Sequence, residues 1–148
     1  MIFDVTTLVS NSQAITGTAN STDFIDLGAT GRVFGTGVNL PRDIGKGYYL
    51  PFLVQVVQTF NNLTTLQASI QVATDTTFTT PVTVALSSAI PLASLVAGFS
   101  FPQLGYNVPA GTNLRYLRVG YTVVGTAPTL GRVTAGVTMG IQTNSGNP

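Results

Sequence analysis

The longest regular alternation of apolar and polar residues occupies two stretches of the chain, Leu114–Val124 and Arg132–Thr143. In the second stretch, every other residue from Val133 to Ile141 is apolar. Successive side chains of a β-strand point to opposite faces, so the pattern predicts two strands that each have one apolar and one polar face. The connection between them, Gly125–Gly131, is rich in turn formers and predicts that the two strands pair as a long hairpin.

Three glycines interrupt the polar faces of these strands, at positions 120, 136 and 140. Glycine weakens a strand and often marks a place where another backbone approaches closely. We therefore expect at least part of this polar face to be covered, either by the chain's own N-terminal segment or by a neighbouring subunit.

The rest of the chain consists of short apolar or alternating runs separated by turn formers. The runs that predict strands are Ser21–Leu27, Phe52–Phe60, Leu66–Ala73 and Val82–Ser87. The stretch Ile90–Ala97 fits either a strand or a helical turn. About seven to nine strands with little or no helix predict an all-β chain of antiparallel sheets, arranged as a sandwich or a barrel.

Loops are predicted at the glycine-rich segment 28–47, at the threonine-rich turn Asp75–Pro81 and in the aromatic region Phe99–Gly111. The first of these also holds Arg32, Arg42 and Lys46, so a large share of the few charges lies in one loop. Such a loop is a candidate contact surface.

The N-terminal segment, residues 1–20, has no sustained period and is rich in Thr, Ser and Asn. These residues are weak helix formers, so we expect an extended arm with one strand. Such an arm either closes the sheet of its own domain or reaches a neighbour. Residues 21–143 then form the sandwich, and residues 144–148 form a polar tail that frays.

Charged residues make up only 7% of the chain, against about 25% in typical soluble domains. There is no Glu, and polarity comes instead from hydroxyls and amides. Uncharged polar groups cost less to desolvate than ions, and the cores of protein interfaces are depleted in charge. We therefore expect a surface that is covered in an assembly, in preference to a monomer.

The chain lacks two of the residue types that most often act in catalysis, because it has no His and no Cys. This excludes His-dependent nucleophilic triads and imidazole or thiolate metal ligation. Asp23 and Asp26 are three residues apart, which places them on opposite faces of a strand, and Asp75 is expected to start a turn. The five carboxylates show no calcium-loop pattern. We expect no enzyme activity, no metal site and no cofactor.

Nucleic acid and membranes are not expected as partners. The six basic and five acidic residues give a net charge of +1, and Arg115 and Arg118 are expected to pair with Asp or an interface. No run of about 20 apolar residues is present. The first residues, Met1–Val5, lack the features of a signal peptide, so we expect a protein made in the cytoplasm or used in something assembled there.

Two blocks of sequence suggest a family. They are Leu114–Thr129, continued by Gly131 and Val133–Gly136, and Asp23–Gly28, with Arg42–Gly45 downstream. Together they resemble the capsid cement proteins of tailed phages, of the type found in short-tailed Bordetella phages. The resemblance implies a jelly-roll sandwich that lies on the outer capsid surface of the virion as an oligomer. There it would bridge neighbouring major-capsid subunits and resist internal DNA pressure.

The expected partners are therefore the major capsid protein and further copies of the chain, as a homodimer or a homotrimer. The expected contact residues are Ile2, Phe3, Val5, Leu8, Arg32, Arg42, Lys46, Phe99, Phe101 and Tyr106. An alternative is a carbohydrate-binding jelly-roll module of a phage tail or fibre, in which Phe99, Phe101 and Tyr106 would form the sugar platform. The chain has no Trp, however, and the large area that aromatic side chains bury favours a role for these three residues as core or interface anchors. A jelly-roll enzyme of the cupin kind is disfavoured, because the chain has no His or Glu to build its metal site.

Overall fold

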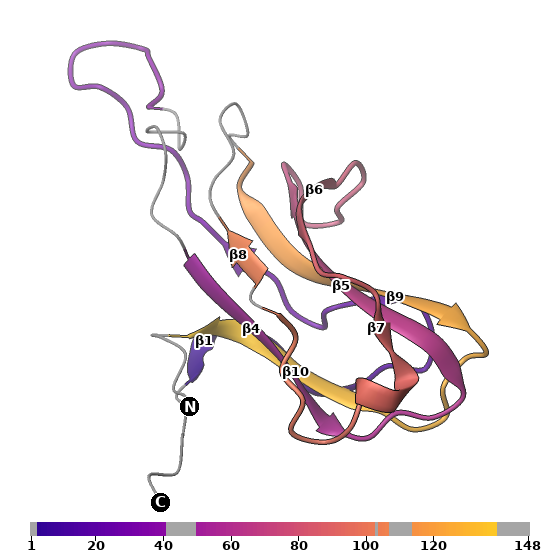
Figure 1. The fold of residues 1–148 in the computed structure, drawn as a ribbon. Coiled ribbons are helices and arrows are strands. Elements are labelled where there is room, and N and C mark those ends of the chain that lie inside the picture. The colour runs from indigo at the N-terminus through magenta and orange to yellow at the C-terminus, as the bar shows by residue number, and fades with distance from the viewer. Residues whose placement is uncertain (1–2, 41–49, 103, 107–113, 139–148) are drawn as a thin grey trace, which may run out of the picture.

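A computed structural model describes residues 3–40, 50–102, 104–106 and 114–138, which form two β-sheets packed face to face (Figure 1). The described residues include no helix that is long and apolar enough to cross a lipid bilayer. The described elements, in chain order, are β1 (Phe3–Ala14), β2 (Ala19–Asn20), β3 (Ile25–Asp26), β4 (Leu50–Gln58), β5 (Leu63–Ala73), β6 (Val82–Leu86), β7 (Ile90–Pro91), the 3-10 helix η1 (Leu92–Ser94), β8 (Leu104–Tyr106), β9 (Tyr116–Gly125) and β10 (Arg132–Thr138).

The strand order confirms the predicted all-β antiparallel sandwich. One sheet has the order β1-β10-β4-β8, and the other has the order β2-β9-β5-β6, with β3 added to β9 and β7 to β5. All these pairs are antiparallel. The chain passes repeatedly from one sheet to the other, which is the arrangement of a double-sheet jelly roll. The undecided stretch after residue 89 is both a short strand, β7, and a helical turn, η1.

The predicted hairpin of the last two long strands is wrong, because β9 and β10 lie in different sheets. Each strand has an apolar face, and the two faces meet across the core instead of lying side by side. The connection between them changes sheet with the help of Gly125 and Gly131, whose φ angles of 95° and 137° suit glycine. The Asn61 side chain holds this connection by accepting hydrogen bonds from the backbone of Thr129 and Leu130, both at 2.9 Å.

The core lies between the sheets and is built from the inward-facing residues that the alternation predicts. From β5 these are Leu66, Ala68, Ile70 and Val72, none of which is exposed. Both sheets contribute to one apolar cluster, whose fully buried larger members are Tyr121, Ile15, Leu66, Ile70, Leu95, Leu117, Val9, Val54, Val56, Val72, Val119 and Val133. Burial of this surface is the main term that stabilises the fold.

The N-terminal segment closes the sheet of its own domain, which is one of the two arrangements we expected. Strand β1 is the outer strand of the first sheet and pairs with β10. Val9 and Ile15 have no exposed surface and belong to the core. Residues 3–15 are therefore an integral part of the sandwich, and the boundary that we expected at residue 20 does not divide the structure.

A bulge in β1 covers the polar face of β10. Phe3 pairs with Thr138 and Leu8 pairs with Gly136, so four residues of β1 lie opposite one residue of β10. Asp4 shapes the bulge by accepting hydrogen bonds from the Thr6 backbone and hydroxyl, and these bonds lower the pKa of the Asp4 carboxyl. The close approach that we predicted at a strand glycine is confirmed at Gly136, and the chain itself provides the cover.

We expect Gly136→Ala to destabilise the fold, because a Cβ there would lie 2.9 Å from the Thr7 carbonyl oxygen and 3.0 Å from the Leu8 Cα. Both are backbone atoms, so β1 must shift, at a cost of about 1–3 kcal/mol in the free energy of unfolding. Gly17→Ala is the control, because nothing lies within 4 Å of a Cβ there. Urea unfolding of both variants tests this, and equal stability would contradict the close contact.

A hydrogen-bond network that runs from the core to the surface links the two sheets. The Tyr121 hydroxyl, on β9, lies 2.8 Å from the Ser10 hydroxyl on β1. Ser10 in turn donates to the Gln13 side-chain oxygen at 2.8 Å. The Gln13 amide then donates to the Asn20 carbonyl at 2.7 Å. Because the single Ser10 hydroxyl proton is used in the bond to Gln13, the Tyr121 hydroxyl is the donor to Ser10. Burial raises the pKa of the Tyr121 phenol, so it keeps the proton that it donates.

We expect Ser10→Ala to cost about 1–3 kcal/mol of unfolding free energy, because it leaves the Tyr121 hydroxyl buried without its partner. Tyr121→Phe should cost less, since Ser10 keeps its bond to Gln13. The double variant should then be about as stable as Tyr121→Phe alone. Chemical unfolding of all four proteins gives the coupling energy, and strictly additive effects would show that the bond does not link the sheets.

Candidate interaction surface

A short hairpin, residues 31–40, projects from the sandwich between β3 and β4 (Figure 1). It is held by its own backbone. The Val33 amide donates to Val38 at 3.1 Å, the Leu40 amide donates to Gly31 at 2.8 Å, and Arg32 pairs with Asn39 between them. We call this segment the 31–40 hairpin. All ten of its residues are exposed, so it adds nothing to the core.

The tip of the hairpin is a β-turn that presents an aromatic ring. The Thr36 amide donates to the Val33 carbonyl at 3.2 Å, which closes the turn around Phe34 and Gly35. Gly35 has a φ of 76°, as the third residue of a type II turn requires. Phe34 takes the second position and has a relative exposure of 102%. The turn thus places the ring entirely in solvent.

The two faces of the 31–40 hairpin differ in chemistry. Val33 and Val38 lie opposite each other, and strand alternation puts Leu40 on the same face. Their exposed fractions are 41%, 63% and 48%. Arg32 and Asn39 share the other face. The hairpin is therefore amphipathic, with the Phe34 ring at its tip, and its apolar side chains are not among the residues of the core cluster.

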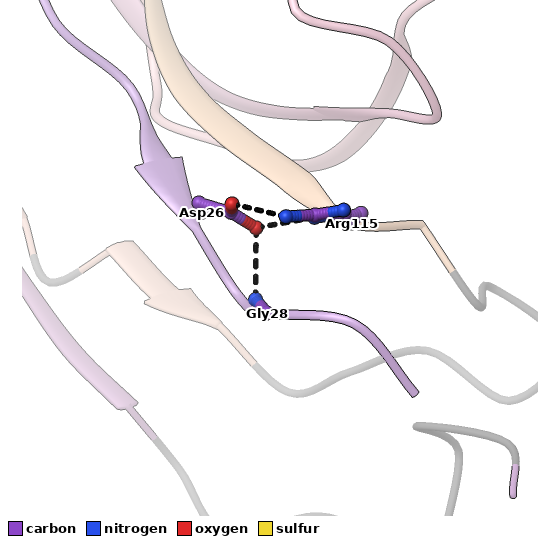
Figure 2. A network of polar contacts seen from close by, with 3 residues as sticks. All are labelled: Asp26, Gly28 and Arg115. Atoms are coloured by element: carbon purple, nitrogen blue, oxygen red, sulfur yellow. Dashed lines mark hydrogen bonds and ion pairs between the residues drawn. The ribbon is translucent and has the colours of Figure 1, made fainter. Parts of the chain in front are cut away.

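An ion pair fixes the point where the hairpin segment leaves the sandwich (Figure 2). Asp26, at the end of β3, accepts two hydrogen bonds from the Arg115 guanidinium, both at 2.6 Å, and one from the Gly28 amide at 2.8 Å. The Leu27 amide also donates to the Arg115 carbonyl at 2.9 Å. The hydrogen bond to Asp26 raises the pKa of Arg115. The predicted pairing of an Arg with an Asp is thus confirmed at Arg115.

Aromatic rings gather beside this ion pair, where β9 begins. The ring of Phe24 lies edge-on to the rings of Tyr116 and Phe78, with centroids 5.5 and 6.1 Å away. The Arg118 guanidinium stacks 4.2 Å above the Phe78 ring and donates to Gln71 at 2.9 Å, while burial lowers its pKa. Phe24 is 42% exposed. Aromatic and Arg side chains of this kind are common in binding surfaces.

The predicted contact residues of β1 lie at the end of the first sheet where β4 begins. Phe3 pairs with Thr138 at the end of β10. The residue before Thr138, Val137, pairs with Phe52 near the start of β4. Phe3 is half-buried, as is Leu8, since both lie against β10. Val5 differs from them, because the bulge holds it out with an exposed fraction of 81%.

Of the charged contact residues that we predicted, Arg32 lies in the exposed 31–40 hairpin. Ile2, Arg42 and Lys46 lie outside the described residues. Tyr106 closes β8, where its backbone pairs with Leu50, and its side chain is also outside the described part. Among the described residues, Arg32 is therefore the predicted cationic contact that lies on an exposed projection.

Phe99 and Phe101 require a correction. Phe101 is only 4% exposed and belongs to the core, and Phe99 is half-buried and packs against the same cluster. Their ring centroids are 5.7 Å apart, edge to face. The Phe101 amide donates to Val54, so this segment runs beside β4. Phe101 is therefore unavailable to a partner or a sugar in the folded chain. The backbone of this segment lies outside the named strands, as predicted, but the ring of Phe101 packs in the core.

Sequence reasoning missed the apolar residues of the 31–40 hairpin and the Phe24–Tyr116 cluster. The many glycines of segment 28–47 predicted a loop, and within this loop only the charged residues were predicted as contacts. The signal that could have found the hairpin is local, because Val38 and Leu40 alternate with Asn39 directly after Phe34-Gly35-Thr36-Gly37, a sequence typical of a turn.

The described residues hold no group of three His, Cys, Asp or Glu side chains that could bind a metal ion. Asp75 has the predicted role of shaping a turn, because it accepts hydrogen bonds from Thr77 and Thr79, which lower its pKa. What remains as a candidate site is a set of exposed apolar and aromatic side chains, and this chemistry suits protein contact.

No curated protein matches this chain. The family model described as Bbp16 does match it, over residues 9–137. The match covers most of the chain, from the middle of β1 to the end of β10, and so includes both sheets. The chain therefore belongs to the Bbp16 family, a family of bacteriophage proteins.

Proposed function

We propose that this phage protein is a structural component of the virion, which binds the outer surface of the capsid and cements neighbouring major-capsid subunits against internal DNA pressure. The observation that carries the proposal is a surface that combines very few charges with exposed apolar side chains, several of which cluster on the 31–40 hairpin. The family places the chain in a phage, and the surface chemistry favours a covered protein over a freely diffusing one.

The broad faces of the sandwich are suited to being covered. Along β5 and β9, hydroxyl and amide side chains alternate with the core residues, and those of Thr65, Gln67, Gln71 and Thr122 reach the surface. Removing such groups from water costs less than removing ions. A stable interface buries about 1,600 Å² in total, and this chain can cover that area with few charged groups to desolvate.

The fold is also suited to bearing strain. A close-packed core has low compressibility, and the buried link from Tyr121 to Ser10 ties one sheet to the other. A cement protein must hold its contact surfaces at a fixed spacing while the shell is pushed outward. A two-sheet sandwich with contact residues on short, hydrogen-bonded projections meets this requirement.

Many identical copies on a symmetric shell act together. If each copy contacts two capsid subunits, or a second copy of itself, its attachment becomes multivalent, and avidity rises without any new kind of contact. The partners under this proposal are the major capsid protein and the chain itself.

We expect the purified protein to bind capsids that lack it and to raise the temperature at which they release DNA. Because the surface is charge-poor, the affinity should change by less than about threefold between low and moderate salt. Sedimentation of mixtures measures binding, and release of a DNA dye on heating measures reinforcement.

Capsids of an unrelated phage are the control for specificity. Failure to bind the parent capsid, or binding without any gain in heat resistance, would contradict the cementing function. A steep loss of binding with salt would instead show that the few charges dominate the contact.

A further inference from the structure

We infer that the 31–40 hairpin is the element that anchors the protein on the capsid. Its tip, Phe34, and its apolar face, Val33, Val38 and Leu40, insert into an apolar pocket on a capsid subunit. Arg32, on the other face, meets a carboxylate at the rim of that pocket. This inference rests on the proposed cementing function and specifies which part of the chain makes the contact.

The first argument is that the hairpin has no role in the chain's own core. Phe34 is completely exposed, and the three other apolar side chains are between 41% and 63% exposed. Single exposed apolar residues are common on proteins, whereas a cluster on a projecting element marks an interaction site. Without a partner, this cluster only exposes apolar surface to water.

The second argument is that the hairpin is shaped before it binds. An isolated two-stranded hairpin is marginally stable in water, yet this one has a closed type II turn and two cross-strand hydrogen bonds near it. Its root is fixed by the hydrogen bonds of Asp26 to Arg115 and Gly28 (Figure 2). Preorganisation of this kind lowers the entropy lost on binding.

The third argument concerns the chemistry of the partner. An aromatic side chain that fills a pocket is a common centre of binding energy. The hairpin has no carboxylate, and in the described ranges of the chain Arg32 makes no ion pair. The complementary surface is therefore an apolar recess with an acidic rim. Contact between the hairpins of two copies fits less well, because it brings together two Arg32 side chains of the same charge.

The binding test compares Phe34→Ser with Leu130→Ser on parent capsids that lack the protein. Leu130 is a matched control, because it is 53% exposed and lies in the connection after β9, at the opposite end of the sandwich (Figure 1). We expect Phe34→Ser to weaken capsid binding about tenfold or more, and Leu130→Ser to leave it within about twofold. Both variants should keep the thermal unfolding temperature of the unaltered protein.

A photo-crosslinking amino acid at position 34 identifies the partner directly. A crosslink to the major capsid protein is the expected result. Equal binding by Phe34→Ser and the unaltered protein, or a crosslink only between two copies of the chain, overturns the anchor and leaves the cementing function intact. If the unaltered protein does not bind the capsid at all, the proposed function fails, and the anchor fails with it.

Discussion

The meeting of apolar strand faces across one core is the constraint on which the rest of the structure depends. Both β9 and β10 have one apolar face. The two strands lie in opposite sheets, and each buries its apolar face in the core that the sheets share. The chain must therefore cross between the sheets several times, with no more than three consecutive strands, β5 to β7, in one sheet. These crossings create the jelly-roll order and gather the connections at the two ends of the sandwich, where the projections that can reach a partner arise.

Alternation predicted the strands well, because it reports burial directly. The predicted strands at Phe52–Phe60, Leu66–Ala73 and Val82–Ser87 agree with β4, β5 and β6 to within a few residues. Alternation says which face of a strand is apolar, but it does not say which strand lies beside it. Pairing β9 with β10 as a hairpin failed for this reason, since their spacing along the chain fits a crossing between sheets as well as a turn.

The candidate surface was harder to predict, because exposure is a property of the tertiary structure. Phe101 and Phe34 look alike in the sequence, as aromatic residues among turn formers, yet one is 4% and the other 102% exposed. The difference is that Phe101 runs beside β4, while the turn at Gly35 holds Phe34 away from both sheets. The charge of Arg32 was visible from the sequence, whereas the exposure of the apolar face opposite it was not.

Under the proposed cementing role, the protein needs a surface that is easily covered and a contact that fixes its orientation, and its low charge means that different parts of the surface meet these two requirements. Faces of hydroxyls and amides are easily covered, but they do little to fix the orientation of the protein on its partner. Many relative positions of the two proteins remove the same groups from water equally well. Charged patches usually fix that orientation. Here a single preorganised projection can do so instead, because a ring at the tip of a fixed hairpin fits a recess in one orientation only. A charge-poor sandwich therefore needs such an anchor more than a charge-rich one does.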